Sequence, residues 1–393
     1  MNRAIGCLAL SCLLLGSGPP VLAAGDPVQA SGEDPPGSVL WTYEVGAQVW
    51  APLTLEAGVL YFGDDEGNLH ALDIATRQPR WRFATTERIR SAATVTGDSV
   101  FFASDDGFLY ALDRVTGKER WTLDLESSGL ERRLPASGPP YAYDYLHSSP
   151  TLAEGTLYVG SAGKKLYAVD AETGQVRWSF AAQASIRSSP AVSDGTVYFG
   201  SWDGNVYAVS GESGEEVWSY DSGAPVQGSP AVVGDRVIVG SRSARVLALD
   251  ALDGEVEWTY VFADGSWVES SPAVVGDIVY VGSSDALVLL ALDARSGAEV
   301  WRFKTGGWSW GTPVVTDEVV YIGSIAAFPY YFPGVDLVAG FFAVDRQTGE
   351  ERWRMTPESI EGYVTGGVFA APVIDGGVVY VASLDGRIHA IRE

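Results

Sequence analysis

Basic side chains are scarce in this sequence, and several of them stand where they could bind an anion. The chain has 26 Lys and Arg against 50 Asp and Glu, a formal net charge of −24. Arginines gathered on one face of such an acidic protein could dock a carboxylate-bearing partner or ligand. Salt bridges to nearby Asp and Glu are the alternative use. The candidates are Arg88, Arg90, Arg132, Arg133, Arg187, Arg242 and Arg245, together with Lys164 and Lys165.

Aromatic side chains are the second set of candidates for binding. Residues 139–145 read Pro-Pro-Tyr-Ala-Tyr-Asp-Tyr, and residues 328–333 read Phe-Pro-Tyr-Tyr-Phe-Pro. Exposed aromatic residues in loops on a rigid scaffold commonly anchor a partner, whereas aromatic residues packed on one another would only plug a channel. The candidates are Tyr141, Tyr143, Tyr145, Tyr330 and Tyr331 in these segments, and Trp202, Trp267, Trp308, Trp310 and Tyr363 elsewhere.

Signatures of catalysis and of metal binding are weak. His70, His147 and His389 lie far apart without ligand spacing, and the first and last of them stand where other repeats have Tyr, which favours core packing. Residues 64–68 and 104–107 resemble calcium loops only superficially, because hairpin turns use the same Asp-Gly and Gly-Asn pairs. No serine-nucleophile motif, phosphate loop or nucleotide fingerprint occurs. We therefore predict no catalytic residue and no metal site.

The first two dozen residues resemble a secretory signal peptide. A short positive start at Asn2-Arg3 precedes an apolar stretch over residues 4–16, and small residues follow at Ala23 and Ala24. The apolar stretch is too short to span a bilayer comfortably, and a single Arg favours the general secretory route over the twin-arginine route. We predict a signal peptide over residues 1–24, a flexible linker over residues 25–38, and a periplasmic or extracellular protein.

Both cysteines, Cys7 and Cys12, lie inside this leader. Neither follows a full apolar stretch, so a lipid anchor is not expected, and the mature chain has no thiol for a disulfide or a metal site. Loss of Arg3 leaves 25 basic against 50 acidic residues, a net charge of −25. This charge argues against nucleic acid and anionic membrane surfaces as partners. No later segment is apolar enough to span a membrane, and a monomer is favoured.

A tryptophan repeat organises the rest of the chain. The repeated residues are Trp41, Trp81, Trp121, Trp178, Trp218, Trp258, Trp301 and Trp353, separated by 40, 40, 57, 40, 40, 43 and 52 residues. Residues 187–220 contain one unit: short apolar strands separated by Ser-Asp-Gly, Trp-Asp-Gly and Glu-Ser-Gly turns. Four antiparallel strands with such turns form one blade of a β-propeller.

The count of repeats predicts a closed ring. Sets of first to third strands begin near Trp50, Arg90, His147, Arg187, Gln227, Glu269, Trp310 and Phe369. Prolines in six of the first strands place those strands at sheet edges that face a channel. The last set ends at Ile391 without a fourth strand, which residues 39–45 can supply. We predict an all-β fold over residues 39–393: an eight-bladed propeller of four-stranded antiparallel blades, whose last blade the N-terminal strand closes.

In such a ring, the loops from fourth to first strands and from second to third strands open on one face, named here the loop face. Two insertions that lengthen the repeat, residues 126–145 and 325–340, fall on it. The candidate arginines and aromatic residues map to the same face. We therefore predict that a binding site lies there.

The turn into each fourth strand resembles the tryptophan-docking motif of PQQ-repeat propellers. It reads Ala-Leu-Asp-Arg-Val-Thr-Gly-Lys-Glu-Arg-Trp over residues 111–121, and six near-copies occur at blade spacing. The copy that ends at Trp81 has Arg77 in place of Gly. The resemblance implies that the eight repeated tryptophans are structural and wedge between neighbouring blades.

The PQQ-repeat family includes quinoprotein alcohol dehydrogenases, which hold PQQ and calcium, and BamB-like propellers, which bind protein partners without a catalytic centre. The dehydrogenases are typically longer and carry a vicinal cysteine disulfide that cannot form here. Length and short loops resemble the BamB-like class, although the sequence lacks that class's lipid-anchoring cysteine. We therefore predict a non-catalytic scaffold, without PQQ or calcium, that engages a protein or peptide partner in the cell envelope. A PQQ-dependent alcohol or sugar dehydrogenase and a carbohydrate-binding propeller are the alternatives.

Overall fold

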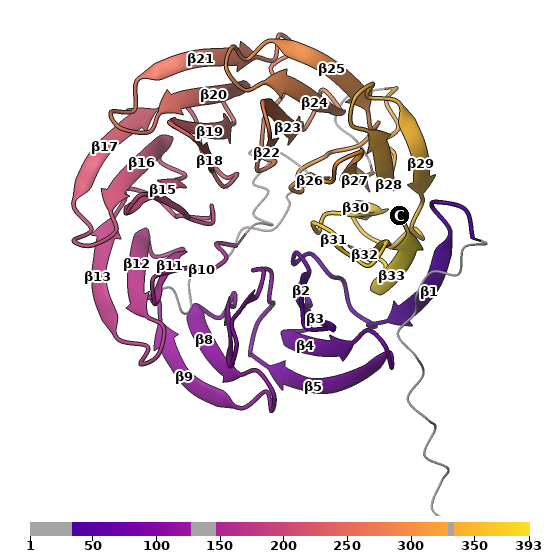
Figure 1. The fold of residues 1–393 in the computed structure, drawn as a ribbon, viewed down its shortest axis with the longest axis horizontal. Helices are drawn as coiled ribbons and strands as arrows, with labels where there is room; N and C mark the ends of the chain where they lie inside the picture. The colour runs from indigo at the N-terminus through magenta and orange to yellow at the C-terminus, as the bar shows by residue number, and fades with distance from the viewer. Residues whose placement is uncertain (1–33, 127–146, 329–333) are drawn as a thin grey trace, which may run out of the picture.

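Eight antiparallel sheets stand around a central channel in the computed structural model, which describes residues 34–126, 147–328 and 334–393 (Figure 1). Each sheet has four strands, which follow sequence order from the channel to the rim except that β1 is the outermost strand of the eighth sheet, and the seventh sheet has one strand more. This arrangement confirms the predicted eight-bladed propeller. No described residue is helical, so this part of the chain contains no helix that could span a membrane.

The strands of blades 1 to 4 run from the channel outward. They are β2 (Thr54–Glu56), β3 (Val59–Gly63), β4 (Asn68–Asp73) and β5 (Gln78–Ala84); β6 (Thr94–Val95), β7 (Ser99–Ala103), β8 (Phe108–Asp113) and β9 (Glu119–Asp124); β10 (Thr151–Ala153), β11 (Thr156–Gly160), β12 (Lys165–Asp170) and β13 (Val176–Ala181); and β14 (Ala191–Ser193), β15 (Thr196–Gly200), β16 (Asn205–Ser210) and β17 (Glu216–Asp221).

Blades 5 to 8 continue the ring. They are β18 (Ala231–Val233), β19 (Arg236–Ser241), β20 (Arg245–Asp250) and β21 (Val256–Val261); β22 (Ala273–Val275), β23 (Ile278–Gly282), β24 (Val288–Asp293) and β25 (Glu299–Lys304); β26 (Val314–Val315), β27 (Val319–Ala327), β28 (Gly340–Asp345) and β29 (Glu351–Met355), with β30 (Val364–Gly367) paired to β27; and β31 (Val373–Asp375), β32 (Val378–Ser383), β33 (Arg387–Arg392) and β1 (Val39–Glu44).

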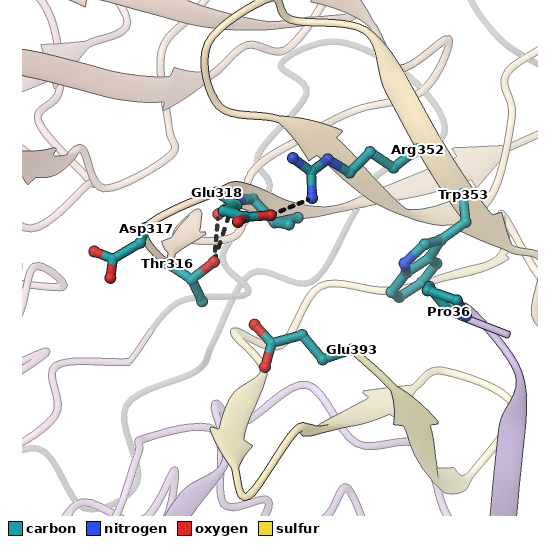
Figure 2. Close-up of a pocket in the computed structure, with 8 residues that line it drawn as sticks. Pro36, Thr316, Asp317, Glu318, Arg352, Trp353 and Glu393 are labelled. Carbon is teal, nitrogen blue, oxygen red and sulfur yellow. Dashed lines mark hydrogen bonds and ion pairs between the residues drawn. The ribbon is translucent and has the colours of Figure 1, made fainter. Parts of the chain in front are cut away.

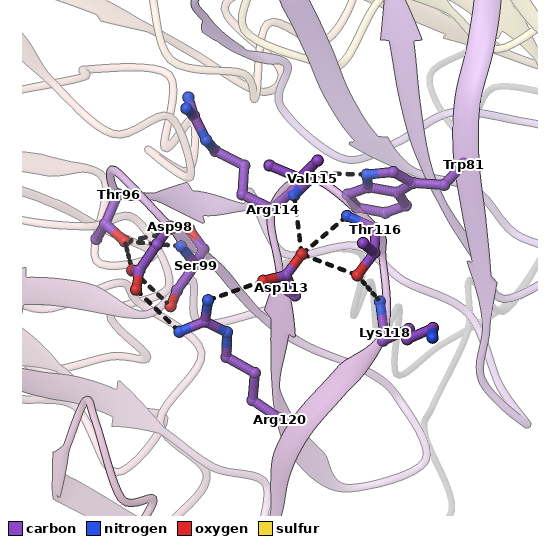
Figure 3. A network of polar contacts seen from close by, with 10 residues as sticks. All are labelled: Trp81, Thr96, Asp98, Ser99, Asp113, Arg114, Val115, Thr116, Lys118 and Arg120. Atoms are coloured by element: carbon purple, nitrogen blue, oxygen red, sulfur yellow. Dashed lines mark hydrogen bonds and ion pairs between the residues drawn. The ribbon is translucent and has the colours of Figure 1, made fainter.

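The hairpin from the third to the fourth strand is held by the Asp of the repeated motif. In blade 2, Asp113 Oδ1 accepts hydrogen bonds from the backbone N–H of Val115 and Thr116 and from the Thr116 hydroxyl, and Asp113 Oδ2 accepts one from Arg120 (Figure 3). Gly117 then takes a φ of +67°, which costs a glycine little. The motif therefore builds a tight turn at the rim.

Each turn docks the tryptophan of the preceding blade. Trp81 Nε1 of blade 1 donates to the Arg114 carbonyl of blade 2 at 2.9 Å (Figure 3). A Cβ on Gly117 would lie 2.6 Å from the Trp81 ring, so the indole needs glycine beneath it. The same N–H to carbonyl bond, at 2.9 to 3.2 Å, is made by Trp121, Trp178, Trp218, Trp258 and Trp301. Each of these six tryptophans is thus hydrogen-bonded to the turn of the next blade.

The turn that departs from the motif is accommodated by a different contact. Arg77, which replaces Gly in blade 1, keeps the left-handed conformation with a φ of +58°. Its guanidinium carbon lies 5.7 Å from the centre of the Trp41 ring of blade 8. A cation–π contact therefore covers the indole where glycine packing does elsewhere.

The two ends of the chain close the ring together. Strand β1 pairs with β33 in antiparallel register, with Thr42 opposite His389, and the two strands lie side by side in Figure 1. The N–H of Gly37 donates to the Arg392 carbonyl at 2.9 Å. A Cβ on Gly37 would lie 2.9 Å from the Trp353 ring, so Gly37 covers the indole of blade 7 as motif glycines do elsewhere. This closure confirms the predicted blade built from both termini.

A belt of serine hydroxyls joins blades 2 to 6 around the channel. The Ser149 hydroxyl accepts from the backbone N–H of Ala92 at 2.9 Å, and the Ser189 hydroxyl accepts from the N–H of Ser149 at 2.9 Å. The Ser229 and Ser271 hydroxyls continue the series at 2.8 and 2.9 Å. A half-buried inner strand thus finds partners for its N–H groups in the next blade. In blades 7, 8 and 1 the corresponding residues are Thr312, Ala371 and Pro52.

Two histidines occupy the predicted core positions. His70 is buried, stacks on Phe62, and lies 2.7 Å from Asp64 Oδ2. His389 is buried between the closing strands, 3.0 Å from the Ser383 hydroxyl. Tyr207 takes the same place in blade 4, where its hydroxyl bonds to Asp203.

A pair of glycine substitutions measures the packing of the docked tryptophan. Gly214 and Gly223 both have positive φ, but a Cβ on Gly214 would lie 2.6 Å from the Trp178 ring while one on Gly223 would meet nothing within 4 Å. Both Gly→Ala changes incur about 1–2 kcal/mol of backbone strain. Gly214→Ala should cost a further ~1–3 kcal/mol from overpacking. Urea unfolding measures the difference, and equal losses would show that the indole shifts freely.

The buried His389 should make the closing blade sensitive to acid. Burial lowers the pKa of His389, although Asp385 opposes this shift. Because the folded state disfavours the protonated ring, its stabilising contribution is complete above the unfolded pKa of about 6.5 and is lost as the pH falls below it. His389→Tyr, the residue of other blades, should lose less stability between about pH 7 and pH 5 than the parent chain. Thermal unfolding across this range tests the expectation, and parallel pH profiles would contradict it.

Candidate functional site

Two residues of each blade meet at the end of the channel on the loop face, and together they form the channel mouth. The first set precedes the inner strands and is buried throughout: Trp50, Arg90, His147, Arg187, Gln227, Glu269, Trp310 and Phe369. The second set comes from the loops between second and third strands: Asp65, Asp105, Ala162, Trp202, Arg242, Ser284, Ile325 and Leu384. The two sets contact each other across blade boundaries.

The part of the mouth in blades 2 to 6 is polar and is held by ion pairs. Arg90 donates to both carboxylate oxygens of Asp65 in the preceding blade, at 3.0 and 2.8 Å. Arg242 Nε donates to Glu269 of the next blade at 2.6 Å, and its Nη2 donates to Gln227 at 3.0 Å. Bidentate and charge-assisted bonds of this kind fix side-chain geometry. They join neighbouring blades at the mouth.

Aromatic rings flank the two paired arginines. The Arg90 guanidinium lies 5.3 Å from the centre of the Trp50 ring. Arg242 lies between two indoles, 5.2 Å from the Trp202 ring and 4.7 Å from the Trp267 ring. Because Trp202 and Trp267 are only half-buried, this stack of three side chains reaches the surface of the loop face.

The part of the mouth in blades 7, 8 and 1 is apolar. Trp308 stacks on Trp310 with ring centres 4.7 Å apart, and Trp50 packs against Phe369 at 5.3 Å. Both Trp308 and Trp310 are buried, in a cluster with Ile325, Val364 and Leu384. These two tryptophans therefore fill the mouth with each other instead of presenting their faces to solvent.

A groove opens beside this apolar part. It has a volume of about 420 Å³ and lies between blades 1 and 2 and the segment that leads into β30. Arg88, with 35% of its side chain exposed, stands 3.6 Å from Asp65 at one wall. Half-buried Tyr363 and the carboxylates of Glu66 and Glu361 also line it. The groove thus offers one accessible cation and one aromatic ring to a ligand.

The predicted binding residues fall into three groups: those buried in the mouth, those at its surface or rim, and those outside the described residues. Arg90, Arg187, Trp308 and Trp310 are buried in the mouth, while Arg242, Trp202, Trp267, Tyr363, Arg88 and Arg245 reach its surface or rim. Outside the described residues lie Arg132, Arg133, Tyr141, Tyr143, Tyr145, Tyr330 and Tyr331.

Several residues of the mouth were not among the predicted binding residues. They are Trp50, Asp65, Asp105, Gln227, Glu269 and Phe369. The signal for four of them was in the repeat, because Trp50, Gln227, Glu269 and Phe369 each stand at the start of a strand set. With the starts of the eight strand sets aligned as one ring, the sequence predicts these four residues at the mouth together with Arg90 and Arg187.

Two arginines of the mouth are already paired with carboxylates. PQQ is an anion with several carboxylates, but Arg90 and Arg242 are already bound to Asp65 and Glu269. Within the described ranges, no three His, Cys, Asp or Glu residues are placed to hold a metal ion. We assign no reaction step to the cofactor of the quinoprotein dehydrogenases.

The ring, the docked tryptophans and the channel mouth define a PQQ-repeat β-propeller. The family model described as outer membrane protein assembly factor BamB matches residues 28–144, 141–285, 265–328 and 339–393, so the chain belongs to this family. No curated protein sequence matches the chain.

Solved structures share the fold at low sequence identity. BamB from Moraxella catarrhalis is 18% identical with a TM-score of 0.69, and the match covers 91% of this chain and 100% of that one. The quinohemoprotein alcohol dehydrogenase from Comamonas testosteroni is 15% identical with a TM-score of 0.69, over 90% of this chain and 76% of that one. A europium-containing methanol dehydrogenase is 14% identical with a TM-score of 0.68, over 88% and 84%. The fold is thus shared by both classes.

The ion pairs of the mouth should be worth far more than those of the surface. Asp65→Asn keeps the shape of the side chain but leaves the buried Arg90 without its carboxylate, and should cost about 3 kcal/mol. Asp277→Asn removes an exposed partner of Arg295 and should cost less than about 1 kcal/mol. Denaturant unfolding of both variants tests this, and similar losses would show that the mouth pair adds no stability.

Proposed function

We propose that this protein is a non-catalytic binding scaffold of the cell envelope that engages a protein or peptide partner through its loop face. The observation that carries the proposal is the mouth itself. Its polar part is occupied by arginine–carboxylate pairs and its apolar part by stacked rings. The face is therefore preorganised, which lowers the entropy lost when a partner binds.

The accessible residues of this face have the chemistry of a protein interface. Trp202, Trp267 and Tyr363 are half-buried aromatic side chains, and Arg88 and Arg245 are accessible cations. Tyr, Trp and Arg are the residue types that dominate binding energy at protein interfaces. In a chain with a net charge of −24, these arginines favour a partner that presents carboxylates near apolar side chains.

Membership of this family supports a proposal for the cellular compartment. A role in outer membrane protein assembly would place the chain in the periplasm, in agreement with the secretory leader expected over residues 1–24. The domain division expected from the sequence, with a linker over residues 25–38 before the ring, belongs to the same proposal. The partner is then a protein of the envelope, and nucleic acid is not expected because of the negative charge.

Site-specific photo-crosslinking in cells tests the face directly. A photoreactive phenylalanine analogue replaces Trp202, Trp267 or Tyr363 on the loop face, and Val115 or Leu252 as controls on the opposite face, where these two side chains are 75% and 82% exposed. We expect one envelope protein to be crosslinked from two or more loop-face positions and from neither control. Crosslinks of equal yield from both faces, or no crosslink from the loop face, would contradict the proposal.

A PQQ-dependent dehydrogenase is the second candidate, favoured by the two solved quinoprotein dehydrogenases that share the fold. Calorimetric titration of the chain with PQQ, with and without Ca²⁺, separates it from the scaffold. The absence of heat is the expected result. Tight, calcium-dependent binding would make the dehydrogenase the better proposal.

A further inference from the structure

The inner strands of the eight blades differ at one half-exposed position. It holds threonine in blades 1 to 3, alanine in blades 4 to 6 and valine in blades 7 and 8. The Thr54 and Thr151 hydroxyls donate to carbonyls of the next blade at 2.7 and 2.6 Å, whereas valine has no group to donate. Blades 7 and 8 therefore present larger apolar side chains here than the other six blades do. In register, the eight residues are Thr54, Thr94, Thr151, Ala191, Ala231, Ala273, Val314 and Val373.

A cavity of about 730 Å³ lies against the inner strands of blades 7, 8 and 1. These strands, β26, β31 and β2, stand around the channel in Figure 1. The apolar part of the wall consists of Leu55, Val314, Val315, Pro372, Val373 and Ile374. All of them except Pro372 are half-exposed. A contiguous apolar surface that solvent can reach is typical of an interaction site.

The cavity opens at the end of the channel opposite the loop face, named here the far end. Hairpins from first to second strands turn at this end of each blade. Gly58, Thr316 and Asp375, which belong to three of these hairpins, complete the wall of the cavity. A ligand would therefore enter the cavity from the far end.

The far end of the channel is surrounded by carboxylates. Each of the eight hairpins carries at least one exposed Asp or Glu at or beside its turn. The lining residues of the cavity include no Lys or Arg from the part of the chain that the structure describes. One carboxylate from each hairpin gives the series Glu56, Asp98, Glu154, Asp194, Asp235, Asp277, Asp317 and Asp375.

Two of these carboxylates at the cavity are available to a ligand. Glu318 is paired with Arg352 at 3.1 Å, but the neighbouring Asp317 side chain points away from that arginine (Figure 2). Within the described ranges, neither Asp317 nor Asp375 makes an ion pair. The apolar cavity thus has negative charges at its edge that no cation of these ranges neutralises by direct contact.

We propose that the far-end cavity binds a basic segment of a partner protein, in which one apolar side chain is flanked by lysine or arginine. The apolar side chain packs on Val314, Val373 and Ile374, and the flanking cations pair with Asp317 and Asp375. Burial of the apolar side chain supplies most of the attraction, and charge complementarity selects the partner. A second copy of this chain, with its net charge of −24, would be repelled. The site lies at the opposite end of the channel from the loop face and does not depend on the function proposed for that face.

Photo-crosslinking with a synthetic peptide tests the proposal on the full chain. The probe is Gly-Lys-Xaa-Lys-Gly with blocked ends, where Xaa is the photoreactive phenylalanine analogue, and mass spectrometry locates the adducts. We expect adducts on β26 and β31, at a yield at least about fivefold higher than with Gly-Glu-Xaa-Glu-Gly. Adducts spread evenly over the hairpins of all eight blades, or equal yields from the two peptides, would overturn the proposal.

Two matched pairs of substitutions separate the cavity from the general negative charge of the far end. Asp317→Asn with Asp375→Asn should lower the yield at least about fivefold, because both cation partners are lost. Glu154→Gln with Asp194→Asn removes the same charge from the hairpins of blades 3 and 4 and should change the yield less than about twofold. All four side chains are exposed, so both variants should keep the parent unfolding temperature. Equal losses of yield from the two variants would show that the cavity is not the site.

Replacing the two valines tests the apolar wall. Val314→Ala with Val373→Ala introduces the residue of blades 4 to 6 and should lower the yield at least about threefold, since the probe loses part of its packing surface. Thermal unfolding of this variant shows that the ring remains folded. An unchanged yield from the folded variant would contradict binding in the cavity.

Discussion

The docking of a tryptophan from each blade into the turn of the next is the contact on which the ring depends. The indole lies on a glycine with positive φ, and its N–H reaches a carbonyl three residues before that glycine, as Trp178 does with Gly214 and Gly211. One side chain thus fills the space between two sheets and satisfies a polar group of the turn. Because the contact recurs at nearly every junction, a blade is stable only between its neighbours, and both ends of the chain must join in one blade to complete the last contacts.

The channel mouth follows from the same geometry. A closed ring brings the loop after each second strand beside the inner strand of the next blade, so Asp65 meets Arg90 and Arg242 meets Glu269 across blade boundaries. The serine belt spans blades 2 to 6, which also carry the polar pairs except for Asp65 of blade 1, while blades 7, 8 and 1 place Trp310, Phe369 and Trp50 before their inner strands. The mouth is therefore divided into a polar part, whose ion pairs join neighbouring blades, and an apolar part, whose side chains pack on one another. Both parts fix the geometry of the loop face, and the binding function proposed for this face would depend on the residues at its rim.

The seam between blades 7 and 8 differs from the regular junctions in how its indole is covered. Regular junctions are filled by their own turns, but at the seam the positions of Tyr321 and Trp353 are kept while the turn is replaced by Gly37 and Glu393. Gly37 restores the packing on the Trp353 indole. A residue far from the repeated turn can thus take over the packing role of its glycine.

The sequence by itself determined the blade count and the strand order, and it indicated the structural role of the tryptophans that recur at blade spacing. These depend on short-range patterns: the spacing of Trp121 and its equivalents, the Asp-Thr-Gly turn and apolar strands of fixed length. It also indicated that His70 and His389 replace core tyrosines. Which arginines stay accessible was decided only by the tertiary structure. Arg88 and Arg90 are two residues apart, yet Arg90 is buried against Asp65 and Trp50 while Arg88 reaches solvent. Pairing of this kind joins residues from different blades at distances set by ring closure, and no local pattern of residue types encodes it.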